Sequence, residues 1–315
     1  MSDLKLFRID GDDAVELSGT SMALERHLQQ LIERNMETVL GVRFLDTEYD
    51  TGARHRGRID SIGIDENGSP VIVEYKRSLN ENVINQGLFY LDWLLDHRGD
   101  FKMLVLENLG KEAAAEIDWS NPRLICIAGD FTKYDEHAVQ QIDRSIELIR
   151  YRRFGDELLA LELLTAVAGS PRGEPGPGSG GSPGARSAAR PASNRAPSKT
   201  VSEYLAQAPA ELSELFDDLD NVLTELGDDV QRKTLKHYFA YKRLKNFACV
   251  EVHPQSGTLL VYLKVDPTTV PLEQGFTRDV SRIGHFGTGN LEVRITSLAD
   301  LKRAMDLLRA SYETG

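Results

Sequence analysis

The chain has 315 residues, of which 41% are apolar, and a formal net charge of -12, so we expect about two domains that each bury a core. The acidic total does not favour tight duplex binding, although clustered basic residues still permit it. Cys126 and Cys249 show neither zinc-ligand spacing nor a disulfide framework, which predicts a reduced, cytoplasmic setting. The sequence shows neither a signal-peptide core nor the roughly 20 apolar residues of a membrane span, so we expect no membrane partner.

Hydrophobic periodicity predicts strands and helices over residues 1–168. A strand pair is expected within residues 4–17. A helix is expected over 23–40, with Ser18, Thr20 or Ser21 as its N-cap. The elements expected after these are a strand at 42–45, a hairpin at 59–75, a helix at 81–97, a strand at 101–106, a short helix at 111–117, a strand at 124–128 and a largely helical stretch at 135–149. Apolar strands flanked by amphipathic helices indicate an α/β layer fold with a mixed sheet.

The composition changes sharply over residues 169–199, where six of the twelve prolines lie together with seven glycines. Such a segment cannot bury enough surface to offset its chain entropy, so we predict a disordered linker. Residues 200–315 then form a smaller α+β domain. Its expected elements are helices at 201–226 and 230–244, a hairpin of 249–252 and 259–263, a strand at 291–295 and a helix at 298–312.

The second of these helices is basic and carries interleaved aromatic residues. Its relevant residues are Lys233, Lys236, His237, Tyr241, Lys242, Arg243 and Lys245. Two interpretations stay open: a solvated helix face, or a surface through which the second domain binds a protein or nucleic acid.

The main functional signal is the predicted hairpin, in which two apolar runs flank turn residues 66–69. Because strand side chains alternate between faces, Glu74 and Lys76 share a face, and the hairpin brings Asp60 beside them. Two carboxylates and an ammonium are costly on a half-buried sheet unless they bind a cation or one another. A plain cross-strand salt bridge is the structural alternative.

Three further features favour a functional site. A helix with an acidic residue precedes the hairpin, and a helix that carries Gln86 and Tyr90 on one face follows it. Basic residues also cluster around the hairpin, namely Arg54, His55, Arg56, Arg58, Lys76 and Arg77.

The order of a helix acid, Asp60, Glu74-Tyr75-Lys76 and Gln86-x3-Tyr90 resembles the PD-(D/E)XK nucleases, and among them the NucS-type and RecB-like endonucleases. The resemblance covers about residues 20–160. It implies a restriction-endonuclease-like mixed sheet flanked by helices. The second domain resembles an uncharacterised domain often found behind such nucleases, which implies no activity.

The resemblance implies phosphodiester hydrolysis with Mg²⁺ or Mn²⁺, which offsets phosphate charge and makes bound water more acidic. Asp60 and Glu74 are the expected metal ligands, with the main-chain carbonyl of Tyr75 as a third. Lys76 is expected to orient or deprotonate the attacking water.

The helix acid is less well defined by the pattern. Glu25 borders the core-facing stripe of the first helix and is favoured, whereas Glu33 is the alternative and is expected to point to solvent. The alternative that Glu25 is an ordinary carboxylate on the helix surface, with no role in the site, has equal weight. Gln86 is expected to hold a water or the phosphate. Tyr90 is expected either to support Gln86 and contact the nucleic acid or to lie in the core.

Arg56 and Arg58 precede Asp60 by four and two positions, so on a strand all three share a face; together with Arg77 they are expected to contact nucleic acid. The sequence thus predicts a metal-dependent endonuclease that acts on DNA in repair, defence or mobile-element control. A homodimer is compatible with this prediction. The alternative is a non-cleaving module that keeps the fold and binds nucleic acid or a protein.

Overall fold

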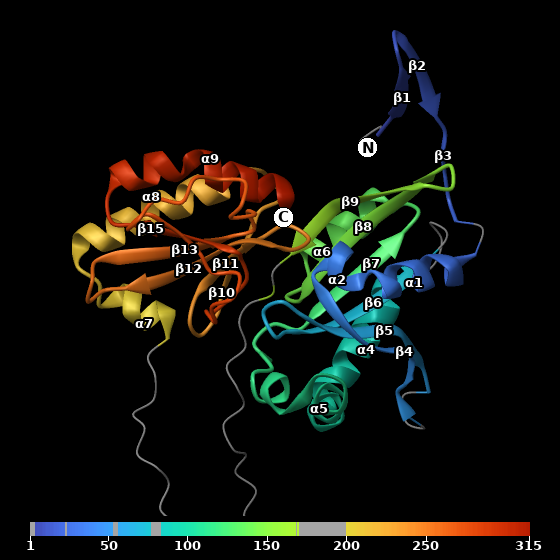
Figure 1. Ribbon diagram of the computed structural model, residues 1–315. Helices are drawn as coiled ribbons and strands as arrows, with labels where there is room; N and C mark the ends of the chain where they lie inside the picture. Colours follow the sequence, from blue (N-terminus) through green and yellow to red (C-terminus); the bar gives the residue numbers. More distant parts are fainter. Residues whose placement is uncertain (1–3, 23, 53–55, 77–82, 168, 170–199) are drawn as a thin grey trace, which may run out of the picture.

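The computed structural model describes residues 4–22, 24–52, 56–76, 83–167, 169 and 200–315. Two sheets, each with its own helices and its own core, lie side by side (Figure 1). The predicted linker lies outside the described residues except for Gly169. Among the described residues, no helix combines the length and the apolar character that crossing a membrane requires.

The first sheet has seven strands in the order β3-β8-β7-β6-β5-β4, with β9 also paired to β8. Its strands are β3 (Gly19–Thr20), β4 (Val42–Asp50), β5 (Arg58–Asp65), β6 (Pro70–Lys76), β7 (Arg123–Ala128), β8 (Ser145–Phe154) and β9 (Leu158–Val167). Strand β7 pairs parallel with both β6 and β8, whereas the neighbours β4, β5 and β6 pair antiparallel. The expected mixed sheet is therefore confirmed.

Helices cover both faces of this sheet. The helices are α1 (Glu25–Arg34), α2 (Met36–Leu40), α4 (Val83–Asp96), α5 (Arg98–Ala115) and α6 (Lys133–Gln140). Helices α1 and α2 pack on the face that presents Val73 and Tyr75, and α4, α5 and α6 pack on the face that presents Ile72. The alternation of apolar residues along β6 thus supplies both cores, and the expected α/β layer fold with flanking helices is confirmed.

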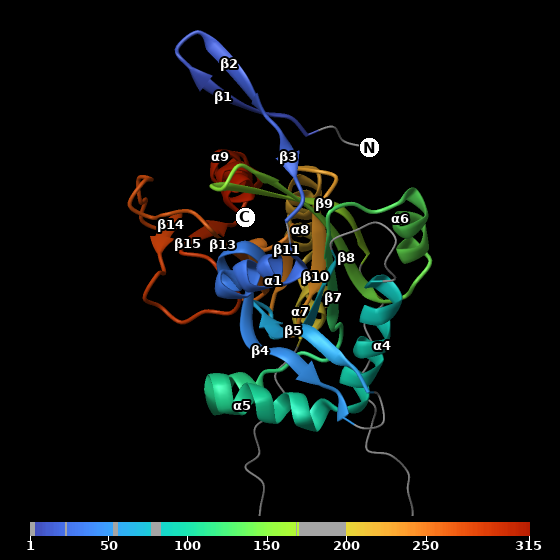
Figure 2. The ribbon, with the colours of Figure 1, turned by 90° about the vertical axis from the view of Figure 1, so that its right-hand side faces the viewer.

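An antiparallel hairpin of β1 (Leu6–Asp10) and β2 (Asp13–Leu17) precedes the sheet, as expected from residues 4–17. It projects away from both domains (Figures 1 and 2). The apolar side chains of Phe7, Ile9 and Val15 are exposed on it.

Several predicted elements are wrong. Residues 101–106 lie in helix α5 and not in a strand. The strand was predicted because a short apolar run has no period that distinguishes a buried strand from a helix. The stretch 135–149, expected to be largely helical, is helical only as far as Gln140, and its last residues belong to strand β8. The helix expected over 23–40 breaks at Asn35, and Leu24, which makes no side-chain hydrogen bond, occupies the N-cap instead of Ser18, Thr20 or Ser21.

The second domain is a six-stranded antiparallel sheet in the order β10-β11-β12-β13-β15-β14. Its elements are α7 (Val201–Ala206), α8 (Ala210–Thr224), β10 (Gln231–Thr234), β11 (Phe239–Lys242), β12 (Asn246–His253), β13 (Thr258–Leu263), β14 (Thr277–Asp279), β15 (Leu291–Ile295) and α9 (Leu298–Thr314). The three helices share one core with the sheet. The α+β expectation is confirmed, but the basic helix at 230–244 is wrong, since this segment forms β10 and β11.

A buried ionic network joins the two domains. Lys242 of β11 donates from Nζ to Glu147 Oε1 at 2.8 Å, and its side chain is 5% exposed. Arg123 binds both oxygens of Glu147 and also donates to Asp65 Oδ2, each at 2.9 Å. Burial acts to raise the pKa of Glu147, but the charges of Arg123 and Lys242 outweigh it and lower that pKa to about 2. The contact between the two domains therefore includes a network of buried charges.

This network predicts that Lys242→Ala lowers the free energy of unfolding by about 3 kcal/mol, because Arg123 alone would then face the two buried carboxylates of Asp65 and Glu147 and one negative charge would be left uncompensated. Urea unfolding of the full chain measures the change. Lys5→Ala is the control, because Lys5 and Glu16 form a half-exposed pair at 3.5 Å, and exposed pairs contribute less than about 1 kcal/mol. Equal losses in the two variants would contradict the prediction.

Candidate active site

The β5–β6 hairpin places Asp60 and Glu74 side by side. Its turn is closed by Asp65, whose Oδ1 accepts from the amides of Asn67 at 2.9 Å and Ser69 at 2.8 Å. The resulting register pairs Ser61 with Val73, one residue from the two acids. The two acidic residues are further joined by bonds to main-chain amides: Asp60 N donates to Glu74 Oε1 at 3.2 Å, and Tyr75 N donates to Asp60 Oδ2 at 2.9 Å.

Both carboxyl groups lie where an anion is unfavourable. Glu74 is fully buried, and its Oε2 has no hydrogen-bond partner among the described residues. Burial, followed by the negative charge of Asp60, raises the pKa of Glu74 to about 9. Burial also raises the pKa of Asp60 to about 6. The positive charge of nearby Lys76 lowers both pKa values but does not outweigh burial, so the pair is under-compensated at this point of the sheet.

Lys76 and Glu25 complete the cluster. Lys76 Nζ lies 3.3 Å from Glu25 Oε1, at the start of α1, and the lysine side chain is 13% exposed. Burial alone lowers the pKa of Lys76, but the carboxylates of Asp60 and Glu25 outweigh this effect and raise it. Three carboxyl groups thus surround one ammonium, and Glu25 is the helix acid that the structure brings next to Lys76.

Gln29, which the sequence analysis missed, lies behind this cluster. It is 7% exposed, and its Nε2 donates to the main-chain oxygen of Asp60 at 2.8 Å and to Glu33 Oε1 at 3.1 Å. Ser61 Oγ donates to the same Glu33 oxygen at 2.6 Å. The expectation that Glu33 points to solvent is therefore wrong, because its carboxylate binds Gln29 and Ser61. The four-residue spacing of Glu25, Gln29 and Glu33 on one side of a helix is a signal that could have revealed the group.

Of the remaining predicted residues, Tyr90, Gln86 and Arg56 lie near the start of β5. Tyr90 is 6% exposed, and its hydroxyl accepts from Arg58 N at 3.1 Å, so its ring supports the start of β5 from the core, which is one of the two positions expected for it. Gln86 Nε2 lies 3.5 Å from the same hydroxyl. Arg56 precedes β5 with a φ of 49°, so strand alternation does not put it on the face of Asp60. Arg77 lies outside the described residues.

Arg58 begins β5 and is exposed, with one guanidinium nitrogen 3.9 Å from Glu48. Together with Arg56 it lines an open cavity of about 650 Å³ that Asp50 also borders. Two arginines therefore border a cavity at the start of β5, the strand that carries Asp60.

The residues present fit a divalent cation. The unpartnered Glu74 Oε2 next to Asp60 offers hard oxygen donors, and Mg²⁺ commonly uses one or two carboxylates while waters complete its shell. Within the described parts of the chain, no cluster of three or more His, Cys, Asp or Glu side chains has the arrangement of a metal cage. Solvent or substrate oxygens would therefore have to supply much of the coordination.

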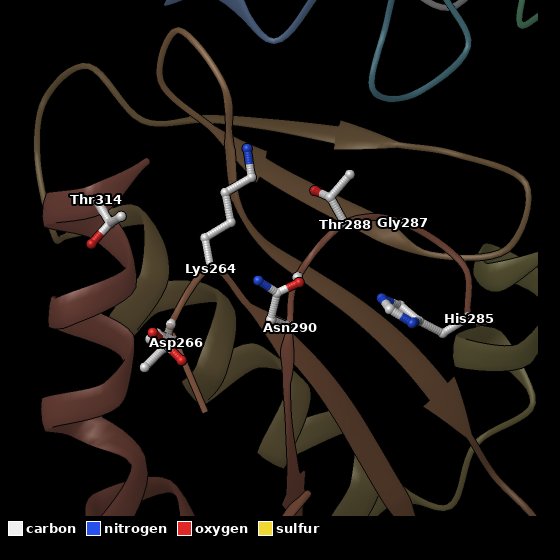
Figure 3. A pocket seen from close by; sticks show the side chains of 9 residues that line it. Lys264, Asp266, His285, Gly287, Thr288, Asn290 and Thr314 are labelled. Atoms are coloured by element: carbon white, nitrogen blue, oxygen red, sulfur yellow. The ribbon is translucent and has the colours of Figure 1, made fainter. Parts of the chain in front are cut away.

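A pocket of about 630 Å³ in the second domain has a different character (Figure 3). Lys264, His285 and Asn290 line it, and its one lining carboxylate is Asp266. Lys264 is already paired with Glu66 of the first domain. The pocket thus lacks the paired carboxylates that distinguish the β5–β6 hairpin.

The raised pKa of Glu74 predicts how the metal-free protein responds to pH. The folded state holds the proton up to about pH 9 and the unfolded state only up to about 4.5, so this group's contribution to stability is lost as pH rises between these values. Glu74→Gln should flatten that decline in thermal unfolding measured in EDTA. Glu37→Gln, at an exposed position, should follow the wild-type curve. Parallel curves for all three proteins would contradict the assignment.

Comparison with known proteins finds a match for the second domain. Residues 201–315 match the family described as a domain of unknown function, DUF5655. An uncharacterized protein of Haemophilus influenzae is 25% identical over 315 residues, which cover 98% of this chain and all of the relative.

Two solved structures are similar to part of the chain. They are a repair endonuclease from Pyrococcus abyssi, with 20% identity and a TM-score of 0.28, and EndoMS in complex with dsDNA, with 20% identity and a TM-score of 0.24. Each match covers 42% of this chain and 50% or 47% of the solved chain, so the chain spans about half the length of these structures.

Proposed function

We propose that the first domain is a metal-dependent endonuclease that hydrolyses phosphodiester bonds in DNA. The observation that carries the proposal is the buried pair of Asp60 and Glu74, with one oxygen of Glu74 unpartnered, beside Lys76. A structural salt bridge would leave charges compensated, whereas here three carboxyl groups face one ammonium. Such an excess is what a cation site requires.

In the proposed site, Asp60, Glu74 and the main-chain carbonyl of Tyr75 hold Mg²⁺ or Mn²⁺. When bound, the metal offsets the charge of the scissile phosphate and makes water more acidic. Lys76 is held by Glu25 close to the carboxylates, so its ammonium orients the attacking water and neutralises charge that develops on the phosphate.

The residues behind the site keep it in place. Gln29 fixes the backbone of Asp60, and Tyr90 fixes the amide of Arg58, so β5 is held on both sides of the acid. Such support matters because misplacing a reacting group by about 1 Å can cost about a hundredfold in rate. Both cysteines are free and buried thiols, which is compatible with a cytoplasmic setting.

The proposal predicts that Asp60→Asn and Glu74→Gln each reduce cleavage at least about a hundredfold, because each removes an anionic metal ligand. Cleavage of single-stranded, branched and mismatched DNA with Mg²⁺ or Mn²⁺ is the measurement, and circular dichroism verifies folding. Asp100→Asn is the matched control, because Asp100-Phe101-Lys102 repeats the acid-x-Lys pattern and Asp100 is exposed in the first turn of α5.

Undiminished cleavage by either site variant would exclude the assigned site. If the wild-type protein binds these DNAs and cleaves none of them, the non-cleaving module is the better description of the first domain.

The proposal also predicts separate roles for the two arginines at the cavity. In a Glu74→Gln background, Arg58→Ala should weaken DNA binding and reduce the salt slope of log K by about one, since each phosphate contact contributes about that much. Arg56→Ala should have a smaller effect, because Arg56 lies outside β5. Binding isotherms over a salt series measure both. An unchanged slope for Arg58→Ala would show that this arginine does not contact the nucleic acid.

A further inference from the structure

A partly open pocket of about 180 Å³ lies between the two domains, away from the carboxylate pair. Strand β10 forms one wall through residues 231–234, and Arg123 and Ser145, at the starts of β7 and β8, form another. At about 30 Å³ for each water, this volume holds about six waters, or one phosphate-sized group.

Positive charge dominates the lining of this interdomain pocket. The four cationic lining residues are Arg123, Arg232, Lys233 and Lys242. Among the residues that the structure describes, none that lines the pocket is acidic. The carboxylates paired with these cations, Asp65, Asp118, Glu147 and Asp220, lie outside the lining. The walls therefore present cations while the compensating acids lie behind them.

The pocket also has hydrogen-bond donors in excess. Gln231 Nε2 is buried and has no partner among the described residues. The Lys242 ammonium has three donors, of which described residues use one, through Glu147. The Arg123 guanidinium has five donors, of which acceptors in the described part of the chain use three. A buried donor without an acceptor destabilises a protein, so this arrangement favours an acceptor-rich guest.

The electrostatics of Lys242 agree with this geometry. Although Lys242 contacts Glu147, burial and then the charge of Arg123 lower its pKa to about 8. An anion in the pocket would relieve that repulsion, whereas a neutral molecule would not.

We propose that the interdomain pocket binds a phosphate-type oxyanion, either free or as the terminal phosphate of a nucleotide or nucleic acid, and that this anion bridges the two domains. Gln231 and Lys233 would contact it from the second domain, and Arg123 from the first. The site is independent of the proposed nuclease chemistry, since it shares no residue with it.

Isothermal titration of the full chain with inorganic phosphate tests the proposal, in EDTA and at an ionic strength held constant with chloride. The wild-type protein should bind one phosphate. Gln231→Leu should weaken binding about tenfold, because hydrogen bonds to charged groups contribute about that factor. Gln231→Glu should abolish it, because it places a like charge in the pocket. Gln255→Leu, in an exposed turn, should bind as the wild type does.

Further titrations with a nucleoside monophosphate and with an oligonucleotide, with and without its 5′-phosphate, distinguish the sources of the anion. Competition with inorganic phosphate by either phosphorylated compound identifies that source and supports the site. If chloride binds the pocket as strongly as phosphate does, the proposal is wrong. Unchanged affinity in folded Gln231→Glu would also overturn it.

Discussion

Asp65 lies at the turn of the β5–β6 hairpin, and its carboxylate binds in two directions. One oxygen accepts two turn amides and so fixes the hairpin register, while the other accepts from Arg123 in the interdomain network. Burial opposes its ionisation, yet the charges of Lys233 and Arg123 lower its pKa. The register carries Asp60 next to Glu74 at the far end of the same strands. Both the candidate site and the domain contact therefore depend on this one buried anion.

The two ends of the hairpin differ in how their charges are balanced. At the turn, Asp65 and Glu147 face Arg123 and Lys242, so two acids meet two bases. At the open end, the carboxylates exceed the single ammonium of Lys76. Balanced burial stabilises a unique arrangement, whereas unbalanced burial raises pKa values and destabilises the folded chain. This contrast within one hairpin is the physical reason to assign structure to one end and chemistry to the other.

Local patterns were sufficient to predict the hairpin, the mixed sheet and the approach of Asp60 to Glu74. They failed where two structures share one pattern. The apolar run 101–106 is compatible with a strand or a helix, and the basic and aromatic residues of 230–244 resemble a helix face although the segment forms two strands. The contacts of Gln29 with Asp60 and of Lys242 with Glu147 join residues 31 and 95 positions apart. No local period encodes such pairings, so they required the tertiary structure.

The shared hairpin limits which changes in chain length the protein tolerates. Side chains along a strand alternate with a period of two, so inserting or deleting one residue between Asp60 and Asp65 would turn one of them to the opposite face. Such a change would separate the acid pair from the domain contact even if every side chain were kept. The exposed β1–β2 hairpin carries no such coupling. We therefore expect natural variation in length to accumulate there and to be excluded from β5 and β6.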